Sequence, residues 1–229
     1  MKDILISIRP KWVEKICHKI GEGNGKPIYE KEIEVRKDEP KQVQVPFKCY
    51  IYCTIARKNG QPLLVYKDGT VCFGDYRNAC NCNANGEVDC YIGEGKVIGE
   101  FTCNRIDEYI LTLDNGDNYA TKDFMFPPFK EACLTQDEIV EYGKGKFLYG
   151  WHISNLKIYD KPKDLKELVT VCNKHYGDDC EGCDVVKGKD YVYIGKDCED
   201  KGLKRLTRPP QSWCYVEARI SKEGDYDAI

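Results

Sequence analysis

The sequence lacks any long hydrophobic run. A transmembrane helix needs about 20 consecutive apolar residues, and no stretch of the 229-residue chain approaches that length. Near the N-terminus, an apolar run at positions 4–8 is interrupted by Ser7 and followed by Arg9 and Lys11, so it is too short for the core of a signal peptide. We therefore expect a cytoplasmic protein without membrane contact.

An excess of positive charge is also missing. The chain carries 35 Lys and Arg residues against 38 Asp and Glu residues, which gives a net charge of −3. This balance excludes a protein that coats nucleic acid non-specifically, because neutralisation of phosphates supplies most of that affinity. Any nucleic-acid site must be a local patch. Two short basic stretches, 143–146 and 201–208, are candidates, although each taken alone is more simply interpreted as a solvated face.

Cysteine, in contrast, is abundant, with 14 residues. Cytosolic thiols stay reduced, so metal binding or plain buried thiols are expected rather than a disulfide framework. Five cysteines occur within apolar patterns and are predicted to be core residues: Cys17, Cys49, Cys53, Cys103 and Cys214.

The more specific metal motif reads CNKHYGDDCEGC and contains Cys172, His175, Cys180 and Cys183. Two residues separate Cys172 from His175, and two separate Cys180 from Cys183. This spacing matches that of a tetrahedral zinc site, which would organise a segment that lacks a core. The alternative is a set of reduced, partly exposed thiols. No organic cofactor is expected.

A second cysteine group is less specific as a metal motif. Its members are spaced seven, one and seven residues apart: Cys72, Cys80, Cys82 and Cys90. Metal binding and free thiols both remain open for this group.

Hydrophobic periodicity predicts an α+β chain. Strands are expected at 3–8, 31–37, 47–56, 96–106, 147–160 and 212–220. Helices are expected at 9–20 and at 133–145, where Thr135 and Glu138 form a capping-box pattern. Residues 58–94 and 163–206 carry little apolar periodicity, so we interpret them as Cys-rich insertions into a single domain of residues 1–229.

The strand at 31–37 has an unusual polar face. In the sequence KEIEVRK, alternation directs Ile33 and Val35 to one side and Glu32, Glu34 and Arg36 to the other. Two carboxylates and a guanidinium in one row indicate either a solvated sheet face or the floor of a site. On the first interpretation, Glu34 and Arg36 would form a surface ion pair that contributes little to stability.

Several stretches together resemble the ASCH domains of bacteria and their phages, which belong to the PUA-like superfamily. They are ILISIRPKWVEKI, KEIEVRK, FKCYIYCT, KVIGEF, YGWHISNLKIYD and LTRPPQSWCYVE. The family hallmark G-x-K-x-x-E-x-R is matched at Lys31, Glu34 and Arg36, whereas Tyr29 occupies the glycine position.

The resemblance implies a PUA-like curled sheet or small β-barrel with flanking helices, and a cleft between the barrel and its helix. It implies RNA binding as the general role, and some small ASCH proteins hydrolyse acetylcytidine with a Lys, a Thr and a Glu. Lys31 matches that Lys, whereas Glu34 stands where the Thr nucleophile would fall. Glu131 is the nearest match to the family's Glu.

Within such a cleft, the three hallmark residues have distinct chemical uses. Arg36 can hold a phosphate with two parallel hydrogen bonds or stack on a base. Glu34 can accept hydrogen bonds from an exocyclic amine, as carboxylates do from cytosine. Lys31 can complete phosphate binding, or act as a base if burial lowers its pKa.

A second candidate ligand-binding stretch is LTRPPQSWCYV at 206–216. Its candidate groups are the forked donor of Arg208, the amide of Gln211, the hydroxyl of Ser212 and the ring of Trp213, on which a base could stack. Alternatively, Trp213 packs in the core and Arg208 caps a sheet edge. Two other tryptophans, Trp12 and Trp151, are predicted to be packing residues.

Three functional hypotheses follow. The first is an RNA-binding module that recognises a modified or unpaired nucleotide in the cleft. The second is a hydrolase acting on a nucleoside or RNA, either an amidohydrolase or a nuclease, with Lys31 and Glu34 transferring protons. The third is a zinc-stabilised adaptor whose insertions bind a protein partner.

Overall fold

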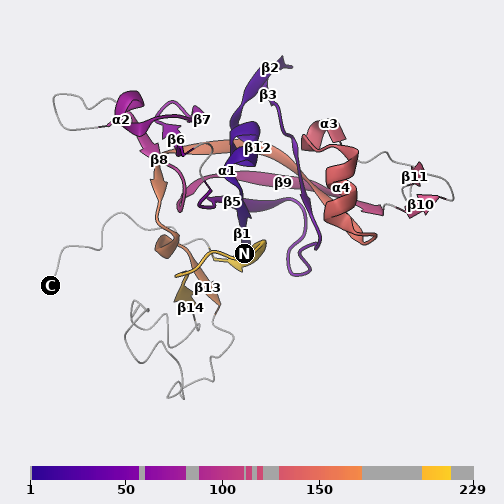
Figure 1. Cartoon of the computed structure of the whole chain (residues 1–229). Coiled ribbons are helices and arrows are strands. Elements are labelled where there is room, and N and C mark those ends of the chain that lie inside the picture. The colour runs from indigo at the N-terminus through magenta and orange to yellow at the C-terminus, as the bar shows by residue number, and fades with distance from the viewer. Residues whose placement is uncertain are drawn as a thin grey trace, which may run out of the picture.

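The computed structural model describes residues 2–56, 60–80, 88–110, 112–114, 118–120, 129–171 and 203–217 (Figure 1). Its centre is a six-stranded sheet. The strands lie in the order β15 (Trp213–Val216), β1 (Asp3–Ile8), β5 (Phe47–Cys53), β9 (Val97–Ile110), β12 (Phe147–Lys163) and β4 (Ile33–Arg36). Only the β1–β5 pair is parallel; the other pairs in this sheet are antiparallel.

Short elements surround this sheet. The helices are α1 (Pro10–Cys17), α2 (Tyr76–Ala79), α3 (Phe129–Ala132), α4 (Gln136–Gly143) and the 3-10 turn η1 (Leu165–Glu167). The smaller strands are β2 (Lys19–Gly23), β3 (Lys26–Tyr29), β6 (Leu63–Tyr66), β7 (Val71–Phe73), β8 (Cys90–Ile92), β10 (Thr112–Asp114), β11 (Asn118–Ala120), β13 (Val169–Val171) and β14 (Leu203–Arg205). The predicted α+β class is confirmed.

The main sheet is curled but open. β4 and β1 are separated in it by three strands, which in a flat sheet would place them about 19 Å apart. Yet Arg36 on β4 donates a hydrogen bond to the carbonyl of Ser7 on β1. A guanidinium spans that gap only if the sheet bends back on itself. Within the described residues, β15 and β4 remain edges that do not pair with each other.

Alternation along the strands builds a core on each side of the sheet. In β1, Ile4, Ile6 and Ile8 enter the larger core beneath α1, whereas Leu5 faces a second cluster on the opposite side. A third cluster joins β4 to α3 and α4, two helices that lie next to each other in Figure 1. Helices α1 and α4 bring side chains from different parts of the sequence to one cleft beside β4.

Helix α1 is shorter than predicted. Val13 and Ile16 are fully buried, and Trp12 and Cys17 pack partly against the same core. The helix was expected to extend to residue 20, but it ends at Cys17, and Ile20 is 57% exposed. The chain becomes extended after α1 because β2 and β3 form a hairpin, which projects beyond the sheet in Figure 1.

The predicted capping box at the start of α4 is confirmed. The Thr135 hydroxyl accepts the Glu138 backbone N–H, and the Glu138 carboxylate accepts the Thr135 N–H. Gly143 is the last helical residue, and Lys144 takes the left-handed conformation that ends the helix, with a φ of 49°. The cap fixes the direction of α4 and so positions the residues that α4 directs toward α1.

The first insertion contains more structure than its sequence suggested. β7, β6 and β8 form a three-stranded sheet between positions 58 and 94. Leu63 and Val65 of β6 are fully buried and belong to the larger core. The short run LLVY was too brief to separate from loop sequence, so the strands of this insertion were not predicted. The division into one domain with two insertions stays a prediction.

The start of the second insertion covers an edge of the main sheet. Val169 on β13 forms an isolated bridge with Glu217, whose N–H donates to the Val169 carbonyl at 2.9 Å. The Thr170 hydroxyl donates to the carbonyl of Tyr215 on β15 at 2.8 Å. β13 therefore lies against the outer side of β15.

Among the described residues, no helix has the length and apolar character needed to span a membrane.

Candidate functional site

A cleft of about 400 Å³ opens between the N-terminal half of α1, the polar face of β4 and α4. Cavities of this size are typical of sites for small molecules or single nucleotide units. Four basic side chains and two carboxylates line it: Arg9, Lys11, Lys31, Arg36, Glu34 and Glu138. The cleft is thus more basic than the chain as a whole, which carries a net charge of −3.

Lys31 lies on the cleft floor and is almost fully buried, with 2% of its surface exposed. Its Nζ donates to the carbonyl of Ala132 at 2.6 Å and lies 3.4 Å from Glu34 Oε2. Burial lowers the pKa of Lys31, although the Glu34 carboxylate opposes this shift. Lys31 is therefore easier to deprotonate than a surface lysine.

Glu34 and Arg36 form a buried ion pair, with Arg36 Nη2 3.0 Å from Glu34 Oε1. Only 6% of Glu34 and 8% of Arg36 is exposed. The same Nη2 donates to the Ser7 carbonyl at 2.9 Å. Among the described residues, Arg36 Nε and Glu34 Oε2 have no hydrogen-bond partner. The wet-surface interpretation of this pair was therefore wrong, because α1 and α4 cover the polar face of β4.

The three buried groups do not balance in charge. Lys31 and Arg36 supply two cations, whereas Glu34 supplies one carboxylate. Buried charge is costly unless it is paired. The floor of the cleft therefore has an electrostatic preference for an anionic ligand.

Two aromatic side chains line the cleft from different helices. Trp12 comes from α1 and Tyr142 from α4. The Nζ atoms of Lys11 and Lys31 lie 4.1 Å and 5.2 Å from the centre of the Trp12 ring. Aromatic rings beside cations form a surface on which a nucleobase can stack next to its phosphate.

The segment 206–216 contributes two of its four candidate side chains to the cleft, and the other two lie elsewhere. Gln211 and Ser212 line the cleft. Arg208 is exposed and does not line it. Trp213 packs partly buried against Trp151, with ring centres 5.8 Å apart, so the packing alternative describes its place.

Glu131 lies close to Lys31 through its backbone only. Its carbonyl accepts the Glu32 N–H at 2.8 Å, and the next residue, Ala132, supplies the acceptor for Lys31. The Glu131 side chain is exposed and is not among the residues that line the cleft. In this arrangement its carboxylate does not share the cleft with Lys31.

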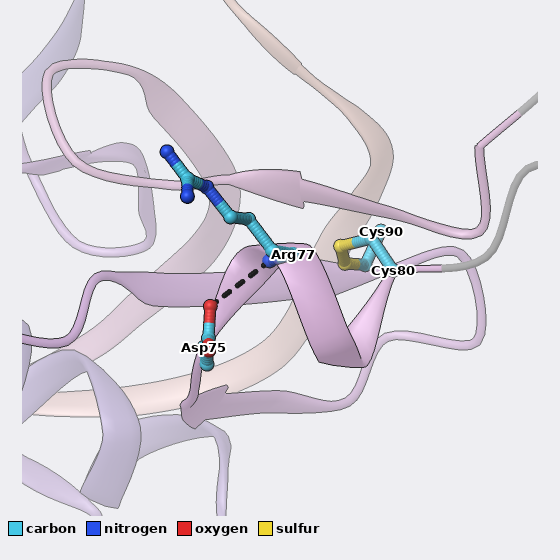
Figure 2. Close-up of a disulfide and its surroundings, with 4 residues drawn as sticks. All are labelled: Asp75, Arg77, Cys80 and Cys90. Atoms are coloured by element: carbon cyan, nitrogen blue, oxygen red, sulfur yellow. Dashed lines mark hydrogen bonds between the residues drawn. A yellow bond between two sulfur atoms is a disulfide. The ribbon is translucent and has the colours of Figure 1, made fainter.

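The predicted zinc ligands Cys172, His175, Cys180 and Cys183 lie outside the described residues. In the first insertion, the structure joins Cys80 to Cys90 in a disulfide (Figure 2), so the expectation of reduced thiols was wrong for this pair. The fold brings their Cα atoms to 5.3 Å, within the range that a disulfide requires. Cys82 lies outside the described residues.

The five cysteines predicted for the core divide into two groups. Cys49, Cys53 and Cys103 are fully buried, as predicted. Cys17 and Cys214 are only partly buried, and each packs at the margin of a core cluster.

The aromatic lining of the cleft was missed by sequence reasoning. Trp12 was assigned to the core because it lies on the apolar stripe of α1, and it does pack partly there. Its position beside Arg9 and Lys11 in the first turn of the helix was the available signal that it also faces a basic cleft. For Tyr142 no comparable signal existed, since only the packing of α4 places it there.

Comparisons with known proteins give a structural likeness only. No protein-family profile and no curated protein sequence matches the chain. Three solved structures of an ASCH protein from Zymomonas mobilis are similar to it. The unaltered protein is 12% identical with a TM-score of 0.44, over 94% of this chain and 87% of that one.

The other two solved structures are point variants of the same protein. The variant in which a tyrosine is replaced by phenylalanine is 12% identical with a TM-score of 0.45, over 95% of this chain and 91% of that one. The variant in which a serine is replaced by alanine is 13% identical with a TM-score of 0.44, over 94% and 88%. The solved protein is named ASCH, which is also the family that the sequence motifs resemble. A likeness at this level assigns no activity to this chain.

Proposed function

We propose that the cleft binds an unpaired nucleotide of RNA. The observation that carries this proposal is the buried Lys31–Glu34–Arg36 group, in which two cations face one carboxylate at the floor of a cavity of about 400 Å³. An excess of buried positive charge favours a ligand that brings its own negative charge.

The lining supports a nucleotide rather than a simple anion. Trp12 and Tyr142 supply faces for base stacking. Arg9 and Lys11 lie at the rim, where they can contact the phosphates on either side of the bound nucleotide. Glu34 supplies an acceptor for an exocyclic amine. Specificity would therefore come from the floor and aromatic walls, and affinity from the rim.

The acidic balance of the chain sets how the affinity should depend on salt. Few phosphates can be neutralised when the basic groups are confined to one cleft, so the salt dependence should be shallow. Each lost phosphate contact reduces the slope of log K against log salt by roughly 0.7 for a single strand.

The test is fluorescence anisotropy with short single-stranded RNA pools at two salt concentrations. Lys11→Gln should weaken binding across the pool and flatten the salt slope, because it removes a rim cation. Arg36→Lys should weaken binding more, because it keeps the charge but removes the forked donors. Lys161→Gln is the matched control, since Lys161 is exposed and lies outside the cleft. Equal binding by all four proteins, or none by the parent, would contradict the proposal.

One observation favours a second candidate function, hydrolysis of a nucleoside or RNA. Lys31 combines burial, a lowered pKa and a carboxylate 3.4 Å away, which suits a group that transfers protons. On this proposal, Lys31→Met abolishes turnover of a bound substrate while RNA affinity changes less than tenfold. Binding by the parent without any detectable product would exclude it and leave the binding function standing.

A further inference from the structure

We infer that Cys80, Asp89 and Cys90 form a zinc site in the first insertion when the Cys80–Cys90 disulfide is reduced. One ligand atom of each residue lies within 4.8 Å of the other two, and this is the single group of this kind in the described part of the chain. Two thiolates and a carboxylate suit Zn²⁺, which accepts sulfur and oxygen ligands.

Regular structure holds the two sulfur ligands. Cys80 is the C-cap of α2, and its N–H donates to the Tyr76 carbonyl. Cys90 is fully buried on β8 and pairs with Tyr66 on β6. Figure 2 shows the two side chains meeting between the end of α2 and the strand. The ligands are thus positioned by the fold of the insertion and not only by their closeness in sequence.

Helix α2 needs such a link. It has four residues, and none of them is buried. A helix this short is unstable alone. The Asp75 carboxylate caps it by accepting the Arg77 N–H (Figure 2) and a hydrogen bond from the Asn78 side chain. The link between Cys80 and Cys90 ties the C-terminal end of α2 to β8 of the small sheet. A covalent bond or a shared metal ion can serve this purpose equally.

The two states exclude each other chemically. Reduction by a phosphine breaks the S–S bond: the phosphine takes the oxygen of one water to become a phosphine oxide, and the two protons of that water go to the sulfurs. Binding of Zn²⁺ then releases both protons as the thiols become thiolate ligands. The sulfurs move apart to about 3.8 Å, the edge of a tetrahedron with 2.3 Å Zn–S bonds. A water completes the four-coordinate shell.

The test compares the full chain in both redox states, under anaerobic conditions. The reduced parent should bind Co²⁺ with thiolate charge-transfer absorption that Zn²⁺ abolishes. It should hold one equivalent of Zn²⁺ more than the double variant Cys80→Ser/Cys90→Ser. The oxidised parent, with the disulfide verified by peptide mass, should also hold one equivalent less than the reduced parent.

Two further variants separate this site from other thiols. Cys72→Ser is the matched control, because Cys72 lies on β7 of the same small sheet but outside the ligand group, and it should keep the full zinc content. Asp89→Asn retains both cysteines and should still form the disulfide, but bind Zn²⁺ at least tenfold more weakly. Equal zinc content in the reduced parent and the double variant, or unchanged affinity in Asp89→Asn, would overturn the inference.

Discussion

Arg36 Nη2 donates to the main-chain carbonyl of Ser7 at 2.9 Å, although their strands are separated by three others in the sheet. This hydrogen bond links β4 to β1 across the curled sheet, and the same guanidinium forms the ion pair with Glu34. The candidate site and the curvature of the sheet are therefore parts of one arrangement. A change in the buried charges should affect both the stability of the fold and the cleft.

Removal of Glu34 tests the role of the buried charges in stability. Glu34→Ala would leave two buried cations without their carboxylate, and we expect it to lower the free energy of unfolding by about 3–5 kcal/mol. Urea unfolding monitored by circular dichroism measures this change. Glu32→Ala is the control: its side chain is exposed two residues away, and its effect should stay within about 0.5 kcal/mol. Equal effects of the two variants would show that the buried group does not stabilise the fold.

The pH dependence of stability should reveal buried Lys31. Burial lowers the pKa of Lys31 in the folded protein below its ordinary value of 10.5, to which it returns on unfolding. Between these two values the unfolded chain binds more protons than the folded one, so the contribution of Lys31 to stability rises with pH. Below the pKa that Lys31 has in the folded protein, the full free-energy cost of burying the charged amine is present. This cost is lost as the pH approaches 10.5.

The measurement is the difference in unfolding free energy between the parent and Lys31→Met across this range. The unfolding free energy of the parent should increase relative to that of the variant as the pH rises. The contributions of other groups that titrate in both proteins cancel in this difference. A difference that is independent of pH would contradict a lowered pKa for Lys31.

The aromatic wall of the cleft can be tested with Trp12. If a base stacks on this ring, Trp12→Ala should weaken RNA binding by about fivefold or more, since stacking contributes about 1–3 kcal/mol per base. Trp12→Phe keeps an aromatic face and should retain most of the affinity. Anisotropy with the same RNA pool measures both. Unchanged binding in Trp12→Ala, with its fold verified by circular dichroism, would remove Trp12 from the site.

Gly99 tests the packing of the main sheet. A Cβ at this position would lie 2.5 Å from the carbonyl oxygen of Lys157 on β12, a backbone atom that cannot rotate away. We expect Gly99→Ala to destabilise the protein by about 1–3 kcal/mol. Gly21→Ala is the matched control, because nothing lies within 4 Å of a Cβ built there. Thermal unfolding of the two variants should separate them clearly, and similar melting temperatures would argue against a close approach of β9 and β12.

Much of the main sheet could be predicted because its strands alternate or carry continuous apolar residues. The polar face of 31–37 was predictable for the same reason: Ile33 and Val35 enter one cluster, and Glu34 and Arg36 pair on the opposite side. A glycine within an apolar strand, such as Gly99, also indicates a bulge or a close backbone approach. Local patterns thus located the floor of the cleft.

The walls of the cleft could not be predicted from local patterns. Whether the polar row on β4 is wet or buried depends on α1 and α4, which reach it only through tertiary packing. The same limit applies to Trp213, whose sequence context equally suits a stacking surface and a core contact. In the first insertion, the pairing of Cys80 with Cys90 depends on β6 and β8, elements that the short apolar runs did not reveal.

The bridge between Val169 and Glu217 has a consequence for self-association. An exposed strand edge presents unpaired N–H and C=O groups to other chains, and proteins commonly cover such edges. Here β13 lies along β15 and occupies part of that edge. A chain shortened by deletion of 163–206 would lose this cover, so it should form oligomers or aggregates through β15 even if the central sheet still folds.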